Sequence, residues 1–293
     1  MRAIRKLYFQ NEFGDRRGLN GENGIFCTDL AGFGFSFESA FSNIGHGFFP
    51  TDVTAKDAQS SVPFTLIFTR NSYKAYQDFI DWLAVAESLA IVYDPTGEQE
   101  YYRDIVIDFV QKGELTRVGW LEVPCSLFGV SPWYLPQPTM LSVQNTGKDE
   151  RKVYPYQYTE SLKYGMDGSA ALSATIVGTG HIPAALELTY YGAISSPKIK
   201  LIGNVSNKTY GVCYIATALE DTDVLKFSTR YENSYVKKVS AAGLETDLLN
   251  NLDLSLTPFF HVPVNEPCTV SIEADNTISG QADMRVYYYY RSV

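Results

Sequence analysis

The alternation of apolar with small or polar side chains at every second position constrains the fold of this chain more than any other feature. Val62, Phe64, Leu66 and Phe68 show it within one short segment. Successive side chains of a β-strand point to opposite faces, so the pattern predicts strands with one buried face. Similar segments cover residues 89–110, as two strands around a turn at 94–97, and residues 119–134, 185–192, 197–204, 259–275 and 284–293.

The aromatic content agrees with a mainly β protein. The 293 residues include 21 tyrosines, 17 phenylalanines and 3 tryptophans, which make up 14% of the chain. Aromatic side chains favour half-buried pleated surfaces, and the tyrosines at 287–290 are expected to pack on the two faces of a strand rather than to stack on sugars. With 45% apolar and 19% charged residues the composition is globular, and the length suggests two domains.

A single segment follows the period of a helix. Apolar residues from Tyr76 to Leu83 recur at the i, i+3, i+4, i+7 spacing that gives an α-helix one apolar face. The sequence therefore predicts one helix over residues 71–89. Asn71 or Ser72 is expected to cap its first amides.

One predicted strand shows a simple division of faces. Ile105, Ile107 and Phe109 are expected on one side, with Asp104 and Asp108 on the solvent side. Paired carboxylates are the groups that glycosidases use, but here alternation along a strand explains their spacing.

A long segment near the N-terminus lacks any period. The alternating Phe33, Phe35 and Phe37 predict a strand, and residues 42–61 then contain glycines and a proline without periodicity. Structureless stretches of about 20 residues are uncommon in compact domains and are often binding loops. We expect this segment to be a binding loop that could extend a hairpin or an arm across a neighbouring subunit.

A proline-rich, charged segment over residues 132–160 indicates a domain boundary. We therefore predict an N-terminal domain over residues 1–135, a linker over 136–160 and a C-terminal domain over 161–293. Short strand patterns at turn-separated intervals in the last segment predict a β-sandwich.

The charge balance excludes several functions. The 33 acidic and 24 basic residues give a formal charge of −9, and no cluster of five basic residues is present, which argues against nucleic-acid binding. The sequence contains no run of about 18 apolar residues, so no membrane span is predicted. The first residues lack the apolar core of a secretory signal.

Histidines and cysteines provide no recognisable catalytic or metal motif. None of the histidines belongs to an H-E-x-x-H helix, and no G-x-S-x-G nucleophile elbow is present, because Ser169 lacks the second glycine. The cysteines fit neither a zinc pattern nor a disulfide framework and are expected to be buried thiols. The residues concerned are His46, His181, His261, Cys27, Cys125, Cys213 and Cys268.

Two further motifs are weak. Gly178 and Gly180 follow a β-branched run, but Pro183 stands where a dinucleotide fingerprint needs its third glycine, and no room remains for a helix. Asp221 and Asp223 are interpreted as turn residues rather than calcium ligands. We therefore predict that the protein is not an enzyme and that it has no catalytic, cofactor-binding or metal-binding residues.

The order of these features resembles the distal tail proteins of long-tailed siphophages and prophages. The resemblance is carried by LAGFGFSFES, by NSYKAYQDFIDWLAVAESLAIVYDP, and by RDIVIDFVQKGEL followed by GWLEVPCSLFGVSPWY. In the second half it is carried by ALELTYYGAISSPKIKL, FFHVPVNEPCTVSIEAD and the terminal tyrosine-rich strand.

This resemblance implies a fold and a role. It implies an N-terminal β-sandwich-like ring domain with one helix and a C-terminal galectin-like β-sandwich. Six copies are expected to form a ring in the virion tail, assembled in the bacterial cytoplasm. The implied neighbours are the major tail tube protein and the tape-measure protein above, and a tail-tip protein, tail-associated lysin or fibre protein below. Some members also anchor receptor-binding proteins, although this chain has little length for a long arm.

Two expectations follow from the ring. Residues 45–58 are expected to reach a neighbouring subunit, so their deletion would release monomers. Six copies at −9 carry a formal charge of −54 (6 × 9), which would let DNA pass a channel without adhering. The alternative interpretation is a two-domain lectin-like protein that binds host-surface carbohydrate.

Overall fold

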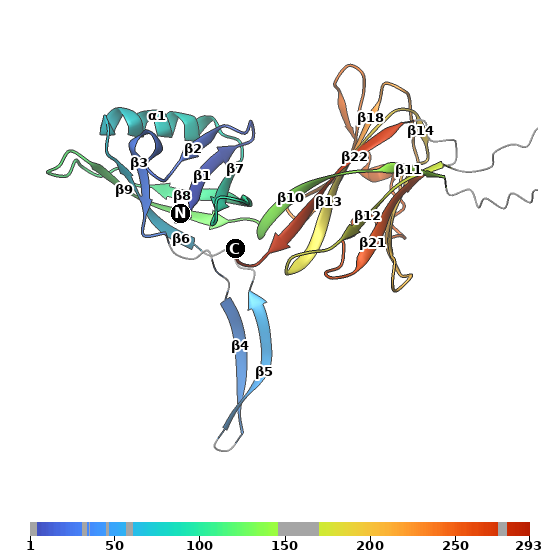
Figure 1. Ribbon diagram of the computed structural model, residues 1–293, viewed down its shortest axis with the longest axis horizontal. Helices are drawn as coiled ribbons and strands as arrows, with labels where there is room; N and C mark the ends of the chain where they lie inside the picture. The colour runs from blue at the N-terminus through green and yellow to red at the C-terminus, as the bar shows by residue number, and fades with distance from the viewer. Residues whose placement is uncertain are drawn as a thin grey trace, which may run out of the picture. The chain divides into compact units, whose positions relative to one another are not determined.

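The computed structural model describes residues 5–30, 34, 36–44, 47–56, 61–145, 170–274 and 280–293. The chain divides into two compact units, each with its own core. Unit 1 comprises Met1–Leu135 together with Tyr289–Val293, and unit 2 comprises Pro136–Tyr288. Both are mainly β, and one α-helix is present among the described residues, as the sequence predicted (Figure 1).

Unit 1 is built from antiparallel strands and helix α1 (Figure 1). Strands β2, β1, β7 and β8 follow one another in the sheet, β8 pairs with β9, and β9 continues through β6 to β3. The elements are β1 Lys6–Asn11, β2 Arg16–Gly18, η1 Glu22–Gly24, β3 Ile25–Thr28, β4 Ser36–Ile44, β5 Gly47–Lys56, β6 Ser61–Phe68, α1 Ser72–Val85, β7 Leu89–Asp94, β8 Tyr101–Val110, β9 Leu121–Gly129 and β10 Trp133–Met140.

The core of unit 1 is rich in aromatic rings. Phe79 of α1 lies against Phe9 of β1, Phe68 of β6 and Trp82, with ring centroids 6.3, 5.9 and 6.1 Å apart. These four side chains are at most 7% exposed. The alternating apolar positions of β6 and β9 complete this core from below the helix, as their period predicted.

The helix differs from its prediction at both ends. It ends at Val85, and Leu89, expected inside it, is the first residue of β7. Asn71 takes the N-cap position with a left-handed φ of 45°, but neither its side chain nor that of Ser72 caps the first amides. The Ser72 hydroxyl lies instead 2.8 Å from the carbonyl oxygens of Phe68 and Gly119, so it acts as a donor to the backbone rather than as an acceptor for the helix amides.

Residues 42–61 have no period in the sequence, and the hairpin expected as one form of this segment is present. The described backbone there forms a hairpin, in which β4 and β5 pair with each other in a two-stranded sheet of their own. The register shifts between Ala40 and Phe41, opposite Pro50. A two-stranded ribbon outside the main sheets of a domain needs no buried face. Its sequence therefore lacks the alternation of apolar and polar residues that identifies the other strands. Phe33 and Phe35 lie outside the described residues.

A β-bulge overturns the predicted faces of β8. Ile107 pairs with Leu127, and Phe109 pairs with the next residue of β9, Ser126, so β8 has one residue more than its partner. The bulge moves Phe109 to the face opposite Ile105. Ile105 is 4% exposed and Phe109 is 44% exposed.

Unit 2 contains two main sheets (Figure 1). One has the order β22, β13, β18, β19 and β20, and the other the order β11, β12, β21, β15 and β16. The elements are β11 Ser142–Asn145, β12 Ala170–Val177, β13 Ile182–Tyr191, β14 Ile194–Ser195, β15 Lys198–Gly203, β16 Thr209–Tyr214, β17 Ala218–Leu219, β18 Val224–Arg230, β19 Asn233–Val239, β20 Glu245–Asp247, η2 Leu249–Asn251, β21 Pro267–Glu273 and β22 Gln281–Tyr290.

The two main sheets each direct one row of side chains into a buried core. On β13, Leu186, Leu188 and Tyr190 are at most 1% exposed. Glu187 and Tyr191 lie on the opposite face of the strand and point outward. Val270 and Ile272 on β21 are fully buried in the second sheet. This arrangement is the two-layer β-sandwich that the turn-separated strands predicted.

The predicted linker differs from the observed chain path. Residues 136–145 continue β10 and form β11, and residues 146–160 lie outside the described residues. Residues 289–293, expected in the second domain, belong to unit 1. Strand propensity in the proline-bearing segment is decided by its sheet neighbours, which local composition does not reveal.

Candidate assembly surface

The sheet formed by β3, β6, β9 and β8 presents an apolar face on the side opposite the core of unit 1. Phe26 of β3 pairs with Ile67 of β6, which pairs with Glu122 of β9. Because paired residues share a face, these side chains all point away from the buried rows of the same strands. Phe26 is 42% exposed.

The same face continues onto β8. Val106 pairs with Phe128, and Phe109 pairs with Ser126 after the bulge. Val106 and Phe109 are 55% and 44% exposed. We call this surface the outer face of unit 1, defined by Phe26, Pro63, Ile67, Val106, Phe109, Pro124 and Phe128.

Contiguous exposed apolar side chains on a folded domain usually mark a surface for another protein. A solvated antiparallel sheet normally carries polar residues on its open face. The outer face of unit 1 departs from this rule in part, because apolar side chains on β3, β6, β9 and β8 stand there among Thr65, Glu122 and Ser126. Its exposed apolar side chains suit association, and no motif in the sequence marks them.

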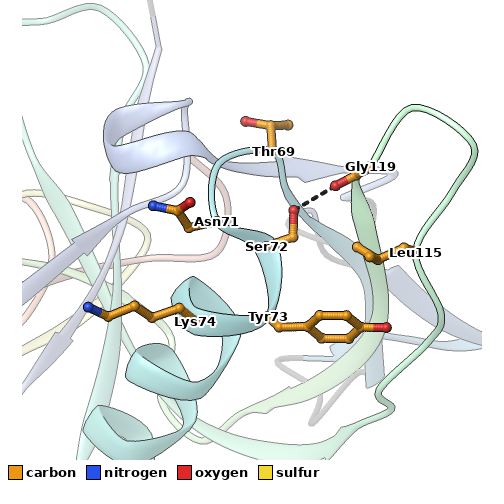
Figure 2. Close-up of a pocket in the computed structure, with 7 residues that line it drawn as sticks. All are labelled: Thr69, Asn71, Ser72, Tyr73, Lys74, Leu115 and Gly119. Carbon is orange, nitrogen blue, oxygen red and sulfur yellow. Dashed lines mark hydrogen bonds between the residues drawn. The ribbon is translucent and has the colours of Figure 1, made fainter.

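A shallow cavity of about 550 Å³ opens at the start of α1 (Figure 2). The Ser72 hydroxyl lies 2.8 Å from the carbonyl oxygens of both Phe68 and Gly119 and donates its hydrogen to one of them. Figure 2 shows Tyr73 beside Leu115, with Lys74 directed to the other side. The Tyr73 hydroxyl donates to Glu114 over 3.2 Å. Both acceptors are backbone carbonyls, so the Ser72 hydroxyl ties the start of α1 to the end of β6 or to the turn before β9.

A second cavity of about 540 Å³ shares Asn71 and Lys74 with the first. Arg17, Arg70 and Asp78 line it as well, so with Lys74 its charged residues give a formal charge of +2 (3 − 1). The Arg17 guanidinium lies 5.1 Å from the centre of the Trp82 ring, which holds it over the core.

The two described histidines, His181 and His261, both belong to unit 2. His46 is outside the described residues. The His261 ring stacks on Tyr231 with centroids 4.1 Å apart, and burial lowers its pKa. His181 is exposed just before β13. Among the described residues, no three histidine, cysteine, aspartate or glutamate side chains are grouped as metal ligands.

The carboxylates singled out in the sequence have structural contacts. Asp104 accepts a hydrogen bond of 2.7 Å from the Tyr134 hydroxyl, and Asp108 is exposed at the bulge. Asp223 is 5% exposed and pairs with Lys238 at 2.6 Å, which lowers its pKa. Asp221 accepts from the backbone amide of Ala193. These contacts support the interpretation of Asp221 and Asp223 as turn residues.

The remaining motifs behave as local structure. Gly178 and Gly180 lie between β12 and β13, and no helix follows them. Ser169 is outside the described residues. The four cysteines are free thiols; three are buried and Cys27 is half-buried, and burial raises the pKa of Cys27 to about 12. Within the described part of the chain, no helix has the length and apolar character needed to span a bilayer.

The signal for the outer face was present in the sequence but ambiguous. In β6 and β8, apolar residues occupy both alternating rows, as in the run Leu66, Ile67, Phe68 and the run Ile105, Val106, Ile107. A strand with two apolar faces predicts burial on both sides. Only the fold shows which face the core of unit 1 covers.

This chain resembles known proteins in the sequence of its N-terminal domain and in the fold of the whole chain. Residues 6–128 match the N-terminal domain of the distal tail protein family. A chain of the phage p2 baseplate in its activated conformation with Ca superposes with a TM-score of 0.68 at 11% identity, covering 99% of this chain and 100% of that chain. The SPP1 Dit protein, described as a hub of the adsorption apparatus in phages infecting Gram-positive bacteria, gives 0.54 at 11% identity over 97% and 98%. No curated protein matches the chain in sequence.

The two solved structures show that the fold of unit 1 and unit 2 together occurs in phage baseplate and hub proteins. The family match runs from β1 to nearly the end of β9, so it includes α1 and the strands that carry the outer face. Residues 6–128 therefore carry the N-terminal domain of the distal tail protein family, and together with the two solved structures of the same fold they confirm the resemblance carried by the sequence.

Proposed function

We propose that this chain forms a homohexameric ring at the distal end of a phage tail tube. The ring joins the tube and the tape-measure end to the tail-tip, lysin or fibre proteins, and DNA crosses its central channel in transit. The protein acts by assembly and without catalysis, in a virion tail put together in the bacterial cytoplasm.

The observation that carries this proposal is the outer face of unit 1. A ring made of identical copies uses two different patches of each subunit, so each copy needs an uncovered complementary surface. Val106 and Phe109 offer apolar area that water contacts in the isolated chain. Burying it between copies favours association by roughly 25 cal/mol for each Å² removed from water.

The β4–β5 hairpin supports the same proposal. Two-stranded ribbons are marginally stable in water by themselves. β4 and β5 pair in a sheet of their own among the described residues. Contact with a neighbouring subunit would supply the stabilisation that the hairpin does not obtain from the sheets of unit 1.

Mass measurement with electron microscopy tests the ring directly. Native mass spectrometry of the purified chain should give six times the 32.7 kDa protomer mass, and negative stain should show a six-fold ring with a central hole. A monomer at micromolar concentration would contradict the homohexamer. A ring of another order would retain the assembly role but overturn the stoichiometry.

Replacement of residues 36–56 by a short Gly/Ser linker tests the hairpin as an intersubunit arm. We expect the ring to dissociate to smaller species by light scattering, because each subunit loses one contact with its neighbour. Unit 1 should remain folded, since the hairpin forms its own sheet. Tryptophan fluorescence checks this, and an unchanged ring would overturn the role of the hairpin.

A further inference from the structure

We propose that unit 2 binds a neutral saccharide in a groove on the outward face of β10, β22 and β13. This binding is independent of the ring and adds to the assembly role. The groove has a volume of about 400 Å³. Its lining residues are Pro138, Thr139, Glu187, Thr189, Tyr191, Asp283, Met284 and Arg285.

The alternation of two neighbouring strands places the polar groups together. Glu187, Thr189 and Tyr191 occupy every second position of β13, and Asp283 and Arg285 do so on β22. These strands are neighbours in the sheet, and their other rows fill the core. The groove therefore brings carboxylates, a guanidinium and a hydroxyl to one surface from positions about 100 residues apart.

The Glu187 carboxylate is held in place by two tyrosines from other strands. Its Oε1 accepts a hydrogen bond of 2.9 Å from the Tyr235 hydroxyl, and its Oε2 accepts one of 2.6 Å from the Tyr287 hydroxyl. Tyr287 is 4% exposed, and the Arg230 guanidinium lies 4.6 Å from the centre of its ring. A carboxylate fixed in this way is a preorganised acceptor, because each oxygen retains a second lone pair.

The protonation state of the two tyrosines keeps this arrangement at neutral pH. Burial, together with the negative charge of Glu187, raises the pKa of Tyr287 to about 12 and raises that of Tyr235 as well. Both phenols therefore remain hydrogen-bond donors, and the lone pairs of Glu187 that face the groove accept from a ligand.

The mixture of groups selects the class of ligand. Carboxylates accept hydrogen bonds from pairs of sugar hydroxyls, and a guanidinium donates hydrogen bonds to sugar oxygens. Arg285 hydrogen-bonds to Tyr287, lies 4.0 Å from Glu187 and is 56% exposed at its side chain, so its remaining guanidinium donors are available to a ligand beside the carboxylate. Tyr191, 39% exposed, offers a ring face for the C–H side of a sugar.

The charge of the groove argues against ionic ligands. Glu187 and Asp283 against Arg285 leave a formal charge of −1 (−2 + 1), which disfavours phosphates and acidic sugars. The arginine in the middle of the lining disfavours a basic peptide. Polar groups of both kinds beside an aromatic ring fit a neutral saccharide best.

Saturation-transfer NMR on the full-length protein tests the site. The probes are galactose, glucose, N-acetylglucosamine, rhamnose and disaccharides of these sugars at about 10 mM, because single-sugar sites bind in the millimolar range. We expect saturation transfer from at least one neutral sugar. Absence of transfer from the whole panel, or transfer only from glucuronic acid or sugar phosphates, would overturn the proposal, as would binding of oligolysine in place of sugars.

Variants locate the binding. We expect the affinity for the sugar to fall by about tenfold or more in each of E187Q, D283N and R285A, because each variant removes a charge-assisted hydrogen bond. Glu245, on the same sheet, pairs with Lys226 and Lys237 outside the groove, so E245Q is the matched control and should bind as the parent does. Asp283 and Arg285 are exposed, so their variants test the groove even where E187Q disturbs folding. Equal binding by all four variants would show that the sugar lies elsewhere and would overturn the assignment.

Discussion

The double substitution V106E/F109E is expected to convert the ring into monomers. Both side chains belong to the outer face of unit 1 and are about half exposed, so the fold tolerates a charge at each position. In a ring contact the same two carboxylates would be buried without partners. Two such charges cost at least about 3 kcal/mol for each contact, or about a hundredfold in the association constant.

Light scattering and native mass spectrometry at matched concentrations measure this effect. The control is L254E, which introduces one glutamate at a position 74% exposed in unit 2 and should leave the ring intact. Unfolding curves must agree between the parent and both variants, so that dissociation is not mistaken for misfolding. A V106E/F109E ring as stable as that of the parent would exclude the outer face as the contact.

Phe79→Ala is expected to lower the free energy of unfolding of unit 1 by about 3–5 kcal/mol. Phe79 is 2% exposed and lies between the rings of Phe9, Phe68 and Trp82. Its loss leaves a cavity where α1 meets the sheets. A domain stabilised by only about 5–15 kcal/mol loses a large fraction of its stability in this way.

Urea unfolding followed by tryptophan fluorescence isolates this effect. All three tryptophans, Trp82, Trp120 and Trp133, belong to unit 1, so their fluorescence does not report on unit 2. V85A is the control on the same helix, because Val85 is 75% exposed and should change stability by at most about 0.5 kcal/mol. A cost below about 1 kcal/mol for Phe79→Ala would mean that the helix is not part of the core.

The tyrosines of the last strand show which features a local sequence pattern can predict and which it cannot. The sequence predicts that residues 287–290 pack within the fold, and Tyr287, Tyr288 and Tyr289 are 4%, 7% and 0% exposed. Their burial was predictable because alternation and ring size act within one strand. The hydrogen bond from Tyr287 to Glu187 was not predictable, because the two residues are 100 positions apart.

The same division applies to the assembly surface. Strand positions, the single helix and the absence of a helix after Gly180 follow from short-range periodicity and from the room left between strands. The bulge that turns Phe109 outward depends on the pairing of β8 with β9. No residue near Phe109 signals this change, because the register of a sheet is set by both strands.

By itself the sequence determined a mainly β protein with one amphipathic helix and a resemblance to distal tail proteins. Propensity and periodicity act over a few residues, so one chain suffices to read them. Only the tertiary structure decided which apolar rows are covered by the core, that residues 36–56 form a hairpin, and that Glu187 meets Tyr235 and Tyr287 in one groove. Those outcomes depend on contacts between distant strands, whose free energies arise only when the sheets are assembled.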